Sequence, residues 1–209
     1  MSAGTDRFRV LSGVAAPLMR ANIDTDTIIR IERMTGTTPQ QMGPWAFEAL
    51  RFRADGTEDP HFVLNQTRFR GAPILLAGDN FGCGSSREGA VWALKHWGVR
   101  CVIAPGFGDI FRGNCFQNGL LPVVLPADQV ERLAAQCLGA DARVTVDLER
   151  QLVIAPDGEE MPFAIEAIRR EALLEGLDDI GLTLRHADLI AAFQARDRQA
   201  RPWVWHPGE

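Results

Sequence analysis

The sequence predicts an α/β fold with a mainly parallel core sheet and a β-rich appendage. From residue 73 onward, short apolar runs alternate with segments of helical spacing, which is typical of parallel strands joined by helices. Residues 143–165 then alternate apolar and polar side chains around a turn, as antiparallel strands do. The chain has 209 residues, of which 46% are hydrophobic, enough for the core of one ordinary domain. We therefore expect residues 1–209 to form a single domain.

The first third of the chain is its least regular part. A short apolar stretch at 8–11 is expected to be a strand, and the Asn, Asp and Thr side chains of 22–29 favour turns. Residues 30–70 show little periodicity, and a region of this kind in a compact domain is often functional. Within it we expect a loop at 35–39, a short helix at 44–52 and a turn at 54–60.

The alternating part predicts three strands and three helices. Gly98 suits the end of the first helix, Asn118-Gly119 ends the second, and Asp157-Gly158 predicts a hairpin turn. The expected strands are 73–77, 99–104 and 120–125, the expected helices are 87–97, 108–117 and 126–137, and strands follow in 143–154 and 161–165. Closing helices are expected at 167–175 and 184–195, before a tail at 196–209 whose Trp203 and Trp205 lie outside any expected element.

Composition narrows the classes of function. The net charge is −5 and no run of Lys and Arg occurs, so nucleic acid and anionic membranes are poor partners. No apolar run approaches the roughly 20 residues that span a bilayer, and the polar N-terminus lacks a signal-peptide core. We therefore expect a cytoplasmic protein. The four cysteines are scattered without a C-x-x-C pair, so we expect buried free thiols at Cys101 and Cys115 and no metal site.

Residues 79–90, Asp-Asn-Phe-Gly-Cys-Gly-Ser-Ser-Arg-Glu-Gly-Ala, are the most informative segment. They lie between the end of an expected strand and the start of an expected helix. Backbone N–H groups are free at a helix start, and the helix dipole favours an anion there. Arg87 adds a planar guanidinium that matches a carboxylate or phosphate. The segment is suited to a small acid beside two hydroxyl groups.

Other interpretations of this segment are weaker. It lacks the Gly-Lys-Ser/Thr of a P-loop, the third glycine of a dinucleotide-binding fingerprint and the central serine of a hydrolase elbow. No histidine has the context of a Ser-His-Asp triad. A purely structural alternative remains, in which Ser85 and Glu88 form a helix capping box. Ser86, Arg87 and the polar cluster at 22–27 favour a functional role instead.

Several segments resemble the signatures of one family. They are 22–29, Asn-Ile-Asp-Thr-Asp-Thr-Ile-Ile; 80–88, Asn-Phe-Gly-Cys-Gly-Ser-Ser-Arg-Glu; 103–111; 118–123; and 176–184. The family they resemble is the small subunit of 3-isopropylmalate dehydratase, in the aconitase superfamily, and the resemblance covers almost the whole chain. It implies the superfamily's swivelling domain, a three-layer β/β/α arrangement.

The resemblance also implies an activity. Such an enzyme is a hydro-lyase of leucine biosynthesis that isomerises 2-isopropylmalate to 3-isopropylmalate through 2-isopropylmaleate. It implies a large subunit that holds a [4Fe–4S] cluster through three cysteines, in a heterodimer or larger assembly, and no metal on this chain. The small subunit would be active only with that partner. A separate alternative is that the free subunit self-associates through surface meant for the partner.

Residue roles follow from motif positions. Ser85 matches the serine that removes the substrate proton, Arg87 the arginine that binds a substrate carboxylate, and Ser86 an added donor. Asp26 matches an aspartate that orients partners in the site, with an Asx-turn as its structural alternative. Cys83 is expected to be a packing or loop residue rather than a nucleophile.

Two departures from the family pattern concern the substrate. The family's substrate-specificity loop falls within the irregular region 30–70, and there residues 30–36 replace the usual segment, which contains a proline and a lysine. The second departure is Gly89, which stands where a histidine is common. Arg30 and Arg33 in this segment either help to bind a carboxylate or are solvated surface charges. The alternatives are therefore a related dehydratase, acting on citramalate, methylmalate or dimethylmalate, and a non-catalytic binding module of the same fold.

Overall fold

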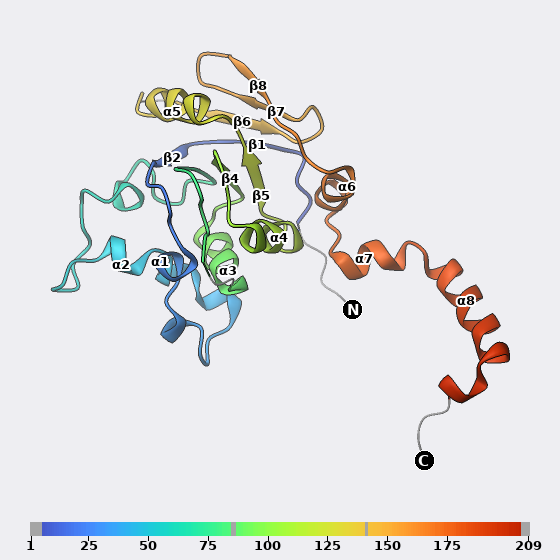
Figure 1. Ribbon diagram of the computed structural model, residues 1–209. Helices are drawn as coiled ribbons and strands as arrows, with labels where there is room; N and C mark the ends of the chain where they lie inside the picture. The colour runs from blue at the N-terminus through green and yellow to red at the C-terminus, as the bar shows by residue number, and fades with distance from the viewer. Residues whose placement is uncertain (1–5, 85–86, 141, 206–209) are drawn as a thin grey trace.

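The chain folds into three layers, two sheets and a layer of helices. The computed structural model describes residues 6–84, 87–140 and 142–205. Figure 1 shows an antiparallel sheet over a parallel sheet, with helices on the far side of the parallel one. The expected α/β class, the parallel core and the β-rich appendage are therefore confirmed.

The parallel sheet has the order β2-β3-β4-β5, and all three pairings are parallel. Its strands are β2 (Ala15–Leu18), β3 (Ile74–Ala77), β4 (Cys101–Ala104) and β5 (Leu121–Val124). β3 and β4 are entirely buried, which explains their unbroken apolar sequence. β2 was not expected, because Pro17 and two alanines weaken the strand signal. Pro17 and Pro122 both lie on edge strands, where proline is tolerated in a sheet.

The antiparallel sheet has the order β1-β6-β7-β8. Its strands are β1 (Val10–Gly13), β6 (Val144–Asp147), β7 (Leu152–Ile154) and β8 (Glu160–Pro162). The expected turn at Asp157-Gly158 connects β7 to β8, with Gly158 at φ 92°. β1 begins two residues later than the expected strand at 8–11 and pairs with β6, so the N-terminus completes the appendage.

Helices cover both faces of the parallel sheet. α3 (Glu88–Trp97) and α4 (Asp109–Gln117) pack on one face, and α5 (Ala127–Gln136) lies on the other side with the antiparallel sheet. The core is accordingly split in two by the sheet. Alternate strand residues such as Leu75 and Leu76 point into different halves of it. α3 ends as expected at Gly98, which adopts φ 115°.

Residues 30–70 are irregular, as expected, but they contain short helical turns. These are η1 (Ile31–Arg33), η2 (Pro39–Gln41), η3 (Gly43–Trp45), α2 (Glu48–Arg51) and η4 (Val63–Asn65), preceded by α1 (Thr25–Ile28). The single helix expected at 44–52 is split, because Phe47 adopts a left-handed conformation between η3 and α2. The buried Arg51 donates hydrogen bonds to Asn65 and to the carbonyls of Pro44 and Ala46, which ties these turns together.

The C-terminal helices differ from expectation. α6 (Ala167–Glu175) lies where expected, but it is followed by α7 (Asp179–Leu184) and α8 (Ala187–Ala200) instead of one helix at 184–195. The expected tail at 196–209 was wrong in its first part, because α8 continues through 200 and Trp203 lies in η5 (Pro202–Val204). Figure 1 shows α8 projecting away from the rest of the molecule. Among the described residues, no helix is both long and apolar enough to cross a membrane.

Candidate functional site

Three loops meet at the carboxyl ends of β2, β3 and β4. The N–H of Asn22 donates to the carbonyl of Asp79 (2.9 Å), and that of Gly82 to the carbonyl of Ile23 (2.7 Å). On the other side, the N–H of Phe81 donates to the carbonyl of Gly106 (3.0 Å). The loop after β3, which leads to the serine pair, is thus held between the loops after β2 and β4. Ligand sites of open α/β sheets lie at this edge of the strands.

Close packing fixes the central loop. Gly82 has φ +71°, and a Cβ there would lie 2.2 Å from the ring of Phe111. Phe111 also packs edge-on against Phe81, with 5.5 Å between ring centroids. Only glycine fits at position 82, so packing alone requires this glycine of the 79–84 segment. Asn22 and Asn80 both adopt left-handed conformations and hydrogen-bond each other through their side chains (2.8 Å).

The expected turn at 22–29 contains α1, which presents Asp26. Asp24 is the N-cap of this helix, and its carboxylate accepts from the N–H of Thr27 (2.6 Å). The N–H of Thr25 donates to the carbonyl of Cys83 (3.1 Å), which joins α1 directly to the loop after β3. Asp24 and Thr25 are therefore structural residues, as expected, while the side chain of Asp26 is 59% exposed.

Asp26 and Arg87 come together in space although 61 positions separate them. The Nη1 atom of Arg87 donates to Oδ1 of Asp26 and forms an ion pair with it. The two side chains line a cavity of about 420 Å³ together with Arg30 and Ile31. The other lining residues are Asp24, Thr27, Glu32 and Ala49. The structure thus brings together two of the four expected site residues. Ser85 and Ser86, the other two, lie outside the described residues.

The start of α3 bears on the capping-box alternative. α3 begins at Glu88, with Arg87 as its N-cap residue and without a side-chain hydrogen bond at the cap. Glu88 is thus the first helical residue, not the third that a capping box requires. Its carboxylate instead accepts from the side chain of Asn118 (2.8 Å). Ser85, the other member of the capping box, lies outside the described residues.

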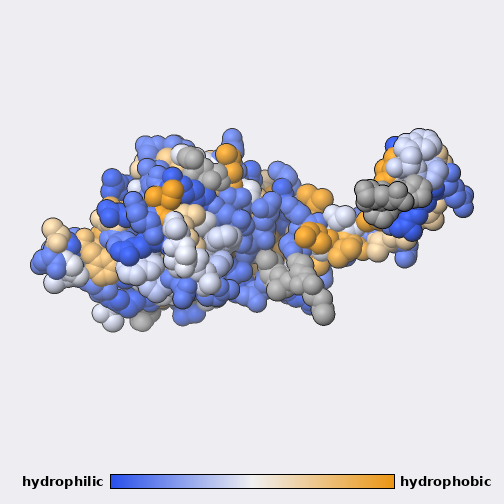
Figure 2. Space-filling model, turned by 90° about the horizontal axis from the view of Figure 1, so that it is seen from below, coloured by the Kyte–Doolittle hydropathy of each residue, from blue (hydrophilic) through white to orange (hydrophobic). Residues whose placement is uncertain are grey.

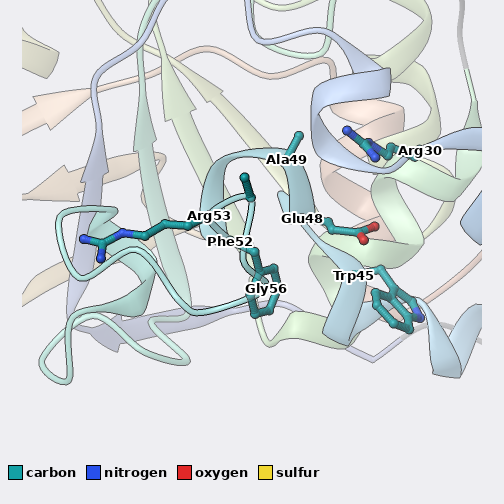
Figure 3. Close-up of a pocket in the computed structure, with 8 residues that line it drawn as sticks. Arg30, Trp45, Glu48, Ala49, Phe52, Arg53 and Gly56 are labelled. Atoms are coloured by element: carbon teal, nitrogen blue, oxygen red, sulfur yellow. The ribbon is translucent and has the colours of Figure 1, made fainter.

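A second cavity of about 470 Å³ adjoins the first and shares Arg30 and Ala49 with it. In Figure 3, Phe52 lies between Arg53 at one end of this cavity and Glu48, Trp45 and Arg30 at the other. Arg33 is engaged beside it: its guanidinium donates to both carboxylate oxygens of Glu48 (2.8 and 2.5 Å) and stacks on Trp45 at 3.7 Å from the ring centroid. That hydrogen-bonded pair lowers the pKa of Glu48. Of the two arginines of the 30–36 segment, only Arg30 therefore faces the cavity next to Arg87.

Sequence reasoning missed Met34. A Cβ on Gly89 would lie 2.5 Å from the terminal methyl of Met34, so the methionine occupies the space beside α3 that a larger residue at 89 would need. The two departures from the family pattern, at 30–36 and at 89, are thus in contact with each other. The sequence held one signal for this contact: a flexible methionine at position 34 and the loss of a bulky side chain at position 89 occur together.

The cysteines do not form a metal site. All four are free, and Cys101, Cys115 and Cys137 are buried, as was expected for the first two. Burial raises the pKa of the Cys101 and Cys115 thiols, and raises that of Cys137 to about 11, so these groups stay protonated. Within residues 6–84, 87–140 and 142–205, no group of three or more His, Cys, Asp and Glu side chains could hold a metal ion. These residues do not fit an iron–sulfur cluster.

This fold and site define a class. The layered sheets, with the site at the carboxyl ends of the parallel strands, are those of a swivelling domain of the aconitase class. The model of the aconitase C-terminal domain matches residues 5–128, more than half of the chain. Two further models match the rest: LeuD_N matches residues 131–167, and the C-terminal domain of the 3-isopropylmalate dehydratase small subunit matches residues 179–204.

Relatives identify the family within that class. The chain is 55% identical over 200 residues to the 3-isopropylmalate dehydratase small subunit of Rhodospirillum centenum, covering 95% of this chain and 98% of the relative. It is 53% identical to that of Gluconacetobacter diazotrophicus, over 95% of this chain and 96% of the relative. A crystal structure of 3-isopropylmalate dehydratase (leuD) from Methanocaldococcus jannaschii is 26% identical, with a TM-score of 0.65, and covers 88% of this chain and 99% of the other. The chain belongs to the family of 3-isopropylmalate dehydratase small subunits.

Proposed function

We propose that this chain is the small subunit of a hydro-lyase that isomerises 2-isopropylmalate to 3-isopropylmalate through 2-isopropylmaleate, in the leucine pathway and in the cytoplasm. The observation that supports it most is the Arg87–Asp26 pair beside the Ser85-Ser86 dipeptide, in a chain about half identical to named small subunits. A guanidinium and a carboxylate at one cavity, with two serines directly before the arginine in the sequence, suit a small acid that carries a hydroxyl group.

In this proposal, Arg87 binds a substrate carboxylate in bidentate fashion and Asp26 orients the guanidinium. Ser85 takes the proton from the carbon next to the carboxylate, and Ser86 donates a hydrogen bond. A serine hydroxyl is a very weak acid, so it can serve as a base only where positive charge and N–H groups stabilise its anion. In this proposal the start of α3 supplies the N–H groups and the Arg87 side chain supplies the positive charge. Arg30, which faces the same cavity, adds positive charge.

The partner in this proposal is a large subunit with a [4Fe–4S] cluster. When bound there, the cluster supplies the Lewis acid that takes the hydroxyl group leaving the substrate. Among residues 6–84, 87–140 and 142–205 no group of three or more His, Cys, Asp and Glu could hold a metal ion, and in this proposal the large subunit supplies the cluster ligands. Our chain contributes the base and the carboxylate site. The complete active site forms only where the two subunits meet.

Reconstitution tests the proposal. The full chain is combined with the large subunit from the same organism under anaerobic conditions, and formation of 2-isopropylmaleate is followed by absorbance. Ser85→Ala should lower kcat by about 10² to 10⁴, the usual contribution of a general base, without loss of the complex. Ser12→Ala, which changes an exposed serine on β1, is the matched control and should retain full turnover. Full turnover by the Ser85→Ala enzyme would exclude this serine as the base.

Because the 30–36 segment departs from the family pattern, the same reconstituted enzyme is also used to test which substrate it prefers. Citramalate, methylmalate and dimethylmalate are tested beside 2-isopropylmalate, because Ile31 and Glu32 line the cavity next to Arg87. We expect the highest kcat/KM with 2-isopropylmalate. A higher value with one of the smaller acids would reassign the substrate while leaving the reaction class in place.

A further inference from the structure

Residues 179–205, comprising α7, α8 and η5, form an extension that we call the C-terminal arm. Figure 1 shows α8 standing clear of the body, and Figure 2 shows the arm joined to the body by a narrow neck. Of the 14 residues of α8, only Asp197 is buried, and η5 is the one element with which α8 makes extensive contact in the described chain. Isolated helices of this length are only marginally stable in water, so most helices depend on packing. In the described chain, α8 lacks such packing against the body.

The arm also concentrates apolar surface. Thirteen large hydrophobic residues of the described chain are exposed, and six of them lie between 180 and 204, each at least 51% exposed. These six are Ile180, Leu184, Leu189, Phe193, Trp203 and Val204. Leu189 and Phe193 are four positions apart and share one face of α8, as Ile180 and Leu184 do on α7. Hydrophobic residues gathered in this way mark a surface that binds another protein.

The tip of the arm is ordered by its own contacts. The carboxylate of Asp197 accepts hydrogen bonds from Nε of Arg201 (2.7 Å) and from the indole N–H of Trp205 (2.9 Å). These two hydrogen bonds lower the pKa of Asp197. η5 is thereby folded against the end of α8, and Trp203 is left 70% exposed. An exposed tryptophan on a pre-ordered support is typical of the residues that dominate binding energy.

The charge of the arm indicates what kind of groove can receive it. Residues 179–205 contain four arginines against three aspartates, on a chain whose net charge is −5. Among the described residues, Arg196 and Arg198 have no ion-pair partner. A groove that receives the arm therefore needs an apolar floor and an acidic rim.

A second copy of the chain does not provide such a groove. Its apolar cavity of about 450 Å³, formed by Pro44, Phe52 and Trp97, is lined by the basic residues Arg51, Arg70 and His96. The residues that line it include no carboxylate that could pair with the arginines of the arm. The other exposed hydrophobic residues of the body are scattered over separate elements, from Val10 on β1 to Ile168 on α6.

The root of the arm lies beside the active-site helix. Asp178, Asp179 and Ile180 line a cavity of about 310 Å³ with Glu88, which follows Arg87 directly at the start of α3. The side chain of Gln117 on α4 donates to Asp179 (3.0 Å) and fixes this root. A protein that covers the open site at Arg87 therefore lies next to the point where the arm leaves the body.

We propose that the C-terminal arm docks in an apolar groove with an acidic rim on the large subunit. Phe193 and Trp203 are its apolar anchors, and Asp197 is the residue that positions the tip. This inference rests on the proposed function, because that function supplies the partner. It assigns the arm to the same partner that closes the active site.

Sedimentation of the full chain with the cluster-bearing large subunit tests the proposal. Trp203→Ala and the double variant Leu189→Ala, Phe193→Ala should each weaken the complex at least about 30-fold, as expected for hot-spot residues. Asp197→Asn, which removes the acceptor charge at the tip, should weaken it by a smaller factor. Gln199→Ala changes another face of α8 and is the matched control, with unchanged affinity expected. All of these positions except Asp197 are exposed, so the body remains folded in each variant.

Three outcomes would overturn the proposal. In the first, the apolar variants bind the large subunit as tightly as the parent chain and the reconstituted enzyme remains active, so the inference fails and the proposed function stands. In the second, the same variants abolish self-association of the chain alone and leave large-subunit binding unchanged, so the arm serves a second copy. In the third, the parent chain neither binds the large subunit nor yields turnover, and the proposed function fails as well.

Discussion

Arg87 is already occupied by Asp26 in the free subunit, so a substrate carboxylate has to share the guanidinium with that residue. A guanidinium can do this because it presents five N–H donors in one plane, whereas an ammonium cannot reproduce that geometry. Arg87→Lys should therefore raise KM about tenfold to a hundredfold, the cost of a lost hydrogen bond between charged groups. The change in kcat should be smaller. Steady-state kinetics of the reconstituted enzyme measures both, and an unchanged KM would contradict the carboxylate-binding role.

The packing of Met34 against Gly89 positions the 31–34 segment beside α3. A methyl group at 89 would meet the end of the methionine side chain, which is flexible and can move. Gly89→Ala should therefore leave stability nearly unchanged, because a gain in helix propensity of about 1 kcal/mol offsets the displacement. It should change KM, because Ile31 and Glu32, which line the cavity next to Arg87, closely precede Met34 in the chain. Adding Met34→Ala should restore KM, and a KM that stays altered in the double variant would refute the contact.

At the scale of elements, the Arg33–Glu48 pair joins η1 to α2 beside the substrate cavity. The pKa of Glu48 is held below its ordinary value of 4.5, so the folded state prefers the ionised carboxylate. The resulting stabilisation is complete above that ordinary pKa and is lost as the pH falls through the lowered value. Denaturant unfolding of the parent chain and Glu48→Gln should thus differ above about pH 5 and converge in more acidic solution. A difference that persists at low pH would show that Glu48 acts through packing instead.

The sequence predicted some helices and strands well and others poorly. α3 was placed correctly because its apolar spacing, its polar start and Gly98 agree with one another. β2 was missed because an edge strand with Pro17 and short alanines has little strand character, and only its pairing with β3 reveals it. The helix expected at 184–195 ended too early. The second half of α8 is rich in polar residues such as Gln194 and Arg198, so it shows little of the apolar spacing that predicts a helix.

The site could be predicted only in part, for a related reason. Asp26 and Arg87 belong to signatures that the sequence displays, but the two signatures meet because β2, which was not expected, lies parallel to β3. The contact between Met34 and Gly89 depends on how an irregular segment packs, which no periodicity encodes. The engagement of Arg33 by Glu48 is of the same kind, and it leaves Arg30 as the arginine that faces the cavity.

At the scale of the whole molecule, the body and the part of the arm from α8 onward are expected to be energetically independent in the free subunit. The two halves of the core lie on either side of the parallel sheet, and no residue of α8 belongs to them. Ending the chain after His186 should therefore leave the thermal midpoint of the body within about 2 °C of the parent, less than 1 kcal/mol for a protein of this size. Leu173→Ala, a buried α6 residue, is the contrasting control and should cost about 2–5 kcal/mol, several degrees. A truncated chain that melts as early as the Leu173→Ala variant would show that the arm packs on the body in solution, and the extended position of α8 would then be wrong.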